Sequence, residues 1–334
     1  MHSITFHTCR RLLLPSIRTL HATGSSLHEN PLGLPRNTDT KPPQFPRRGT
    51  GPPIKRAIPN VKRVVLVASG KGGVGKSSVA VNLATILAMR EGRERLRVGL
   101  LDLDVFGPSV PKLMGLDRAD EPLVTQSGAL VPLLNHGLPC MSMGFLLGHD
   151  GEDKPVVWRG LMVQKAVQQL LFDVDWRADA SGWKGTGLDV LVVDMPPGTG
   201  DVPLTVGQLV KIDGVVIVST PQDVALADVR KGIAMFRKVG VPISGLILNQ
   251  AYMLCPNCDS KHELFGSAHG FKSVASNLGV KIMAELPLVP QVSASGDSGN
   301  PYALVGAATQ TQGGLQWMEE MERAAALVLD TIQL

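Results

Sequence analysis

A glycine-rich loop with two lysines is the part of the chain whose residue types and spacing most clearly indicate chemistry. Residues 70–77 read GKGGVGKS and fit the phosphate-binding pattern G-x-x-x-x-G-K-[ST]. The glycines let backbone N–H groups turn toward phosphate oxygens, and the positive end of the following helix adds to the attraction. Lys76 is expected to reach the β and γ phosphates of a nucleotide, and Ser77 to hold Mg²⁺. The predicted nucleotide-binding residues of this loop are Gly70, Lys71, Gly72, Gly73, Val74, Gly75, Lys76, Ser77 and Ser78.

The first lysine of the loop, Lys71, needs a separate explanation. Lys76 already occupies the phosphate pocket, which leaves little room for a second ammonium group, so Lys71 is expected to point elsewhere. A loop with two lysines resembles the deviant Walker A motif of the nitrogenase iron protein and cell-division ATPase superclass. The resemblance implies that Lys71 crosses a dimer interface and acts on the partner's nucleotide. A solvated surface lysine is the alternative.

Three aspartates follow apolar runs and could complete a magnesium and water site. Asp194 ends the run LDVLVVD, which is a Walker B arrangement, and its carboxylate would hold a water molecule on Mg²⁺. The residues that follow, MPPGTGD, suit a loop that senses the γ phosphate. Asp102 and Asp104 stand two residues apart, so on an extended segment both project from one face. One could help to hold Mg²⁺ while the other orients the attacking water. Asp104 is therefore a candidate catalytic residue beside Lys71 and Lys76, and a helix cap is the alternative role for either acid.

A close pair of cysteines, Cys255 and Cys258, is the second decisive feature. A single CxxC can be a redox dithiol, half of a zinc site or half of a cluster site, and its late position in the chain disfavours the redox use. A [4Fe-4S] cluster wants four thiolates, which a symmetric homodimer would supply. Zinc competes, because His262 follows at Cys-x₂-Cys-x₃-His spacing.

The elements that must position these residues follow one pattern along the chain. Continuous β-branched runs alternate with segments of helical periodicity, which indicates a doubly wound α/β fold whose mostly parallel sheet is covered on both faces. In such a sheet ligands bind at the carboxyl ends of the strands, where the polar residues collect. The predicted strands include residues 64–68, 98–101, 190–193, 215–218, 246–248 and 282–286, and predicted helices include residues 161–171 and 223–239.

The N-terminal part of the chain differs in composition from the rest. Residues 1–28 contain three arginines and no acid, which is typical of a mitochondrial transit peptide, and residues 29–58 are rich in Pro, Gly and Arg, as in an extended linker. The globular domain is expected to span residues 59–334. Residues 1–60 carry nine Lys/Arg and two Asp/Glu, which leaves 24 against 27 in the remainder and argues against a nucleic-acid surface. No apolar run approaches the ~18 residues of a membrane span, so no stable membrane insertion is expected.

Several motifs in order resemble one family, the Mrp/ApbC iron-sulfur carriers, which are P-loop NTPases of the deviant Walker A (SIMIBI-type) class. The motifs include GKGGVGKSS, DLDVFGPSVP, VVWRG, LDVLVVDMPPGTGD, STPQDVALADV, CPNC and GDSGNP, and the match runs from about Val61 to the C-terminus. With the transit-like presequence, the chain is most similar to the mitochondrial member that serves respiratory complex I assembly.

The resemblance implies an ATPase with a labile [4Fe-4S] cluster between Cys255 and Cys258 of two protomers. It also implies that Asn249 and Pro287 hold adenine, and that the homodimer delivers the cluster to apo-proteins in the mitochondrial matrix. No residue identifies the cluster donor. One alternative is a metal-free or zinc-binding switch ATPase of the membrane-positioning type, but residues 315–334 carry four acidic residues and a single arginine, unlike the basic helix that such a protein needs. Another is a nitrogenase-like reductase that keeps its cluster.

Overall fold

The computed structural model describes residues 54–90, 95–105, 107–146, 160–177, 185–306 and 311–334. The predicted transit peptide and residues 29–53 of the predicted linker lie outside this part. The end of that linker is packed against the domain, since the Lys55 ammonium donates to the carbonyls of Val239 and Gly240 and the Ile58 side chain is buried. The packed chain therefore begins slightly before the predicted start at Pro59.

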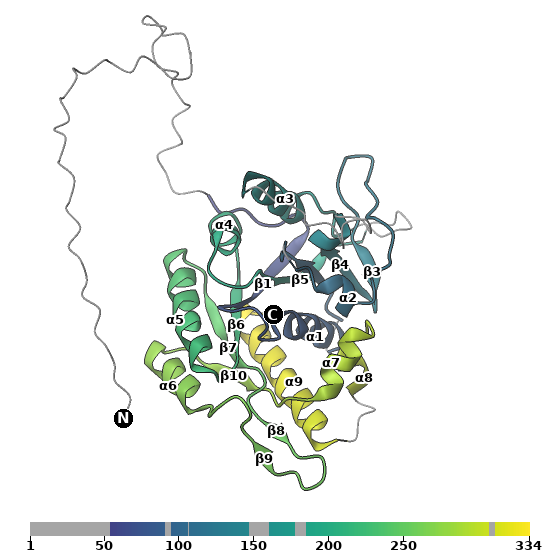
Figure 1. The fold of residues 1–334 in the computed structure, drawn as a ribbon. Helices are drawn as coiled ribbons and strands as arrows, with labels where there is room; N and C mark the ends of the chain where they lie inside the picture. Colours follow the sequence, from purple (N-terminus) through teal and green to yellow (C-terminus); the bar gives the residue numbers. More distant parts are fainter. Residues whose placement is uncertain (1–53, 91–94, 106, 147–159, 178–184, 307–310) are drawn as a thin grey trace, which may run out of the picture. The chain divides into compact units, whose positions relative to one another are not determined.

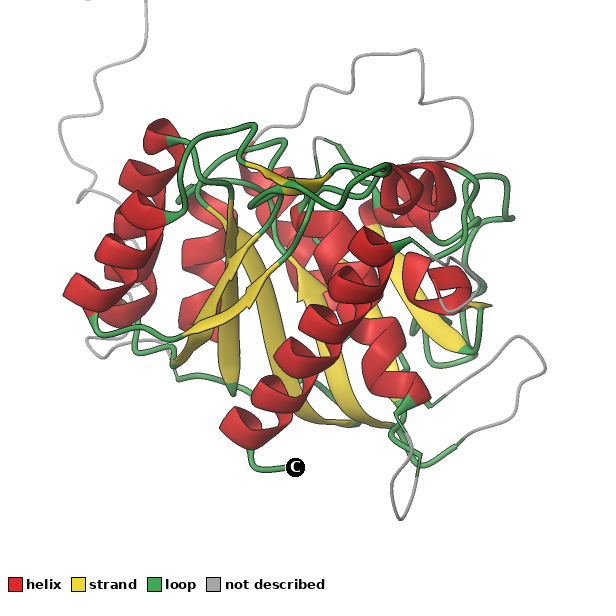
Figure 2. Cartoon of the chain, turned by 90° about the horizontal axis from the view of Figure 1, so that it is seen from below, coloured by secondary structure: helices red, strands yellow, loops and turns green. Residues whose placement is uncertain are grey.

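One sheet of eight strands forms the centre of the described domain (Figures 1 and 2). Its order is β10-β7-β6-β1-β5-β2-β4-β3, and all neighbours are parallel except β3 and β4. All six runs predicted as strands are confirmed, because each forms part of this sheet. The strands are β1 (Val61–Ser69), β2 (Val98–Asp102), β3 (Leu133–Asn135), β4 (Leu138–Ser142), β5 (Leu188–Asp194), β6 (Gly214–Ser219), β7 (Ile243–Leu248) and β10 (Ile282–Glu285).

Helices cover both faces of the sheet, which confirms the doubly wound class (Figure 2). Helices α1 and α9 pack together on one face, and α5 lies on the other, flanked by α4 and α6. Helix α1 is apolar almost all round because the sheet and α9 bury it from two sides. The helices are α1 (Lys76–Met89), α2 (Val110–Leu113), α3 (Gly160–Phe172), α4 (Asp201–Leu209), α5 (Asp223–Lys238), α6 (His269–Leu278), α7 (Pro290–Asp297), α8 (Tyr302–Val305) and α9 (Gln312–Ile332).

A short hairpin stands apart from the main sheet. Strands β8 (Met253–Leu254) and β9 (Lys261–His262) pair antiparallel between β7 and α6, and they carry the two cysteines in the turn that joins them. The predicted strands include neither this hairpin nor β3 and β4. Within the described residues, the structure has no helix that combines the length and apolarity needed to cross a bilayer.

Candidate functional site

The phosphate-binding loop joins the end of β1 to the start of α1. Gly73 and Gly75 have φ of 79° and 80°, a left-handed conformation in which a side chain would be strained. Gly70 is required for another reason, since a Cβ there would lie 2.6 Å from the backbone carbonyl carbon of Asp228 in α5. The glycines of the motif are thus set by local backbone geometry and by the close approach of a helix.

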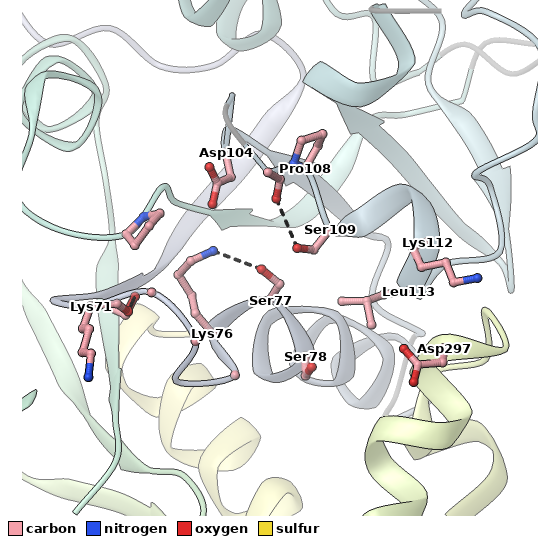
Figure 3. A pocket seen from close by; sticks show the side chains of 16 residues that line it. Lys71, Lys76, Ser77, Ser78, Asp104, Pro108, Ser109, Lys112, Leu113 and Asp297 are labelled. Atoms are coloured by element: carbon pink, nitrogen blue, oxygen red, sulfur yellow. Dashed lines mark hydrogen bonds between the residues drawn. The ribbon is translucent and has the colours of Figure 1, made fainter. Parts of the chain in front are cut away.

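A pocket of about 520 Å³ opens over this loop at the carboxyl ends of the central strands (Figure 3). Beside the loop itself, its wall is formed by the segment after β2, the last residues of α2, Pro197 after β5 and the end of α7. Its lining includes Lys71, Gly72, Gly73, Gly75, Lys76, Ser77, Ser78, Asp104, Pro108, Ser109, Lys112, Pro197 and Asp297. The loop predicted to bind nucleotide and the predicted catalytic aspartate therefore share one cavity.

A buried ion pair forms the floor of the site. The Lys76 ammonium lies 2.6 Å from Oδ1 of Asp194 and 3.1 Å from Oγ of Ser77, and the side chains of Lys76 and Asp194 are only 6% and 0% exposed. Burial raises the pKa of Asp194, and the charge of Lys76 opposes that rise. Oδ2 of Asp194 is buried without a hydrogen-bond partner in the described structure. An unpartnered carboxylate oxygen beside a serine hydroxyl fits a magnesium ion, which prefers oxygen ligands.

The two aspartates after β2 occupy different environments. Asp104 lines the pocket, whereas Asp102 is fully buried beneath it. The Asp102 carboxylate accepts hydrogen bonds from the N–H of Asp104 at 2.9 Å, the N–H of Val110 at 3.2 Å and the hydroxyl of Ser142 at 3.1 Å. Burial, and then the charge of Asp194, raise the pKa of Asp102 to about 7. Asp102 thus fixes the segment that carries Asp104.

Ser142 is a site residue that the sequence reasoning missed. It ends β4, pairs in register with Asp102 of β2, donates to the Asp102 carboxylate and accepts from the N–H of Gly144. A serine at the end of a short strand gives no signal of its own in the sequence. Its role becomes visible only when the neighbouring strand is known.

Lys71 is exposed and points away from Lys76 (Figure 3). Its carbonyl accepts a hydrogen bond from the Ser69 hydroxyl at 2.9 Å, which fixes the backbone of the loop, while its ammonium makes no ion pair with any described residue. The orientation is the one expected from crowding around Lys76. A role across a dimer interface stays a prediction.

Neither Asn249 nor Pro287 lines the wall of the pocket. Both are buried, and the Asn249 amide donates to the carbonyl of Val74 in the phosphate-binding loop at 2.9 Å. This contact ties the end of β7 to the loop. Adenine binding by Asn249 and Pro287 stays a prediction.

The cysteine pair occupies an open turn at the tip of the β8–β9 hairpin. Cys255 is half-buried and Cys258 is exposed. The turn is held by hydrogen bonds from the Cys255 N–H to the Ser260 carbonyl at 3.0 Å and from the Asp259 N–H to the Cys255 carbonyl at 2.9 Å. Hydrogen bonds from Ser260, and then from Cys255, lower the pKa of the Cys258 thiol, which favours the thiolate that binds metals.

The metal-ligating side chains around this turn are few. In the part of the chain that the structure describes, no group of three or more His, Cys, Asp or Glu side chains could hold a metal ion. His262 therefore does not complete a three-ligand zinc site with Cys255 and Cys258 within one chain.

Comparison with known proteins places this geometry in a family. A ParA-type family model described as "NUBPL iron-transfer P-loop NTPase" matches residues 60–321. The iron-sulfur cluster transfer protein NUBPL of Mus musculus is 49% identical over 251 residues, 75% of this chain and 73% of the relative. The iron-sulfur protein required for NADH dehydrogenase, mitochondrial, of Arabidopsis thaliana is 47% identical over 244 residues, 73% of this chain and 72% of the relative.

Solved structures agree with these sequence matches. The nucleotide-binding protein of Archaeoglobus fulgidus in complex with ADP superposes with a TM-score of 0.59 at 34% identity, covering 72% of this chain and 88% of that one. The cell-division ATPase MinD of Pyrococcus furiosus shares the fold, with a TM-score of 0.53 at 17% identity over 80% of this chain and 98% of that one. The family match covers most of the chain, including the phosphate-binding loop and the cysteine hairpin, so the chain belongs to the NUBPL iron-transfer P-loop NTPase family.

Proposed function

We propose that this protein is an ATP-dependent carrier of iron-sulfur clusters. Two copies hold one labile [4Fe-4S] cluster as cargo between their Cys255 and Cys258 side chains and deliver it to apo-proteins. The names of the relatives support the cargo, since one is called an iron-sulfur cluster transfer protein and another is required for NADH dehydrogenase. Subunits of respiratory complex I in the mitochondrial matrix are the proposed recipients.

The observation that carries the proposal is the open hairpin with only two thiols. A [4Fe-4S] cluster binds four thiolates, and the hairpin of one chain offers Cys255 and Cys258. A second copy related by a twofold axis would bring the same two thiols to the same place, because such an interface uses one surface patch twice. A cluster held at an exposed, shared site is easily released, which suits delivery.

The nucleotide half of the proposal is weak ATP hydrolysis coupled to cluster transfer. Lys76 would bind the phosphates, Ser77 and Asp194 would hold Mg²⁺ directly or through water, and Asp104 would orient the attacking water. Magnesium would neutralise charge on the phosphates. The Archaeoglobus neighbour in complex with ADP supports nucleotide binding in this pocket.

Anaerobic reconstitution with iron and sulfide tests the proposal. We expect about two iron atoms per chain, which corresponds to one four-iron cluster per dimer, and transfer of that cluster to an apo-acceptor. Cys255→Ala and Cys258→Ala should each remove the iron, whereas Cys140→Ala, which changes a buried thiol away from the hairpin, should keep it. Retention of zinc without iron would overturn the carrier function. ATP-driven reduction of a dye with no cluster transfer would replace it with a reductase.

A further inference from the structure

Tyr252 ties the base of the cysteine hairpin to the rest of the domain. This residue directly precedes β8, and its hydroxyl donates to Oε1 of Gln316 in α9 at 3.0 Å. Its carbonyl accepts from the N–H of Leu288, in the segment after β10, at 2.6 Å. Its ring lies 4.0 Å from the ammonium of Lys261 in β9. Tyr252 thus joins the hairpin to two other elements of the domain.

The hairpin itself is short. Strands β8 and β9 have two residues each, and they pair only through Met253 with His262 and Leu254 with Lys261. An isolated two-stranded hairpin is marginally stable in water, so the orientation of its tip depends on how its base is attached. Cys255 follows Tyr252 by three residues. Loss of the hydrogen bond from Tyr252 to Gln316 would therefore change the orientation of the Cys255 and Cys258 side chains at the tip of the hairpin.

We infer that Tyr252 is a positioning residue that holds the cysteine hairpin in the orientation that retains the cluster, and so sets the rate of cluster release. The inference rests on the proposed carrier function. Two copies must present four thiolates to one cluster at the same time, and each chain's pair is aimed by its own Tyr252.

The step that the anchor slows is a ligand exchange without oxidation or reduction. A thiol of the recipient protein loses its proton and forms an iron–sulfur bond while the bond from iron to Cys255 or Cys258 breaks. The released cysteine thiolate takes up one proton, so the charge balances. Exchange begins when one of the four carrier thiolates moves off the cluster, and a firmly anchored hairpin makes this movement rarer.

The matched substitutions are Tyr252→Phe and Gln316→Leu, which remove the same hydrogen bond from opposite sides. Phenylalanine keeps the ring beside Lys261 and the backbone bond to Leu288. We expect each variant of the full chain to release its cluster to an apo-ferredoxin about three to ten times faster, the range that one net hydrogen bond supports. The double variant should be no faster than either single one, because the two changes delete one interaction.

The readouts separate positioning from damage to the fold. Iron per chain and ATP turnover should match the wild type, and the unfolding midpoint of the apo-protein should fall only slightly and by the same amount in both variants, because both lose the same hydrogen bond. The rate at which the cluster's visible absorption leaves the carrier should rise. Unchanged release by both variants from a protein that takes up iron normally would overturn the inference and leave the carrier function intact. A wild-type protein that takes up no iron would overturn the carrier function itself.

Discussion

The nucleotide end and the cysteine hairpin of this molecule are built in opposite ways. At the nucleotide end, Lys76 and Asp194 come from distant parts of the sequence and form a buried pair at 2.6 Å, and Lys76 lines the pocket over the phosphate-binding loop. At the hairpin, the exposed Cys258 and half-buried Cys255 stand on two-residue strands. One chain thus brings the phosphate-loop lysine and its partner aspartate together, whereas the hairpin of one chain presents two thiols.

The two regions are nevertheless close along the chain. Asn249 bonds to the phosphate-binding loop through Val74, Ala251 donates to the carbonyl of Leu286, and Tyr252 anchors the hairpin. Residues 249–252 therefore form a short, hydrogen-bonded link between the nucleotide end and the cysteine hairpin. Substitutions on either side of this link test how far each region depends on a second copy of the chain.

The largest expected effect tests whether ATP turnover at the nucleotide end needs a residue from a second chain. If Lys71 donates its charge to the partner's nucleotide, Lys71→Ala should lower ATP turnover by about 10³ to 10⁵, as loss of an arginine finger does. The free energy of unfolding should change by less than ~0.5 kcal/mol, because the side chain is exposed.

Steady-state ATP hydrolysis over a range of protein concentrations is the measurement for Lys71. The wild-type rate per chain should rise with concentration, and Lys211→Ala, a change at another exposed lysine, should keep the wild-type rate. Full turnover by Lys71→Ala would mean that the lysine is a surface residue and that the pocket works in a single chain.

Lys76→Ala should damage both activity and stability. Loss of the phosphate contact should lower ATP turnover by about 10² to 10³. Removing one partner of a buried pair leaves Asp194 uncompensated, so the free energy of unfolding should fall by about 3–5 kcal/mol in urea titrations at neutral pH. The double change Lys76→Ala with Asp194→Asn should be less destabilised than Lys76→Ala alone. If the loss of stability in the double variant equalled the sum of the losses measured for Lys76→Ala and Asp194→Asn separately, the two side chains would not be coupled.

Asp102 should give the nucleotide end a dependence of stability on pH. Its pKa is about 7 in the folded chain against an ordinary value of 3.8, so its contribution to stability is full below pH 4 and is lost as the pH rises through 7. Without nucleotide, this carboxyl should lower the free energy of unfolding by about 1 kcal/mol per pH unit between pH 4 and 7. Asp102→Asn should remove that slope in urea titrations, and Asp120→Asn, at an exposed acid, should keep it. An equal slope in the wild type, Asp102→Asn and Asp120→Asn would show that Asp102 does not cause the pH dependence.

Three glycines of the phosphate-binding loop give a graded series. Gly75→Ala combines a φ of 80° with a collision against the Asn249 amide, Gly73→Ala has the strained φ alone, and Gly72→Ala has neither. We expect stability losses of about 1–3 kcal/mol, about 1 kcal/mol and close to zero in that order. Thermal or urea unfolding of the three variants measures the series. A Gly72 variant as unstable as the Gly75 variant would contradict this account of the loop.

The sequence predicted the nucleotide end well because the motifs that indicate it are local in the sequence. A β-branched run, a glycine loop and an apolar helical run stand next to one another in residues 61–89, and the structure forms a strand, a loop and a helix there. The two acids after β2 show where local reasoning ends. Strand alternation predicted one face for Asp102 and Asp104, but β2 ends at Asp102, so the alternation does not continue to Asp104.

The remaining features depend on contacts between distant segments. Ser142 reaches Asp102 only because β4 pairs with β2, and Asn249 reaches Val74 only because β7 ends beside the loop. The hairpin strands are too short and too polar at Lys261 and His262 to show a periodic pattern. The CxxC spacing predicted a metal or redox role for the hairpin but gave no information about the contacts of Tyr252 at its base.

The smallest expected effect concerns the stability of the open region. Cys258→Ser should change the free energy of unfolding of the apo-protein by less than ~0.5 kcal/mol, because the side chain is exposed and serine keeps a hydrogen-bonding group near Ser260. Urea titration without metal measures this, with Cys140→Ser as the contrasting change, since Cys140 is fully buried in the core and a hydroxyl there should cost about 1–3 kcal/mol. If Cys258→Ser destabilised the apo-protein as much as Cys140→Ser, the thiol would contribute to the fold of a single chain. The contrast between a closed nucleotide site and an open cargo site would then be wrong.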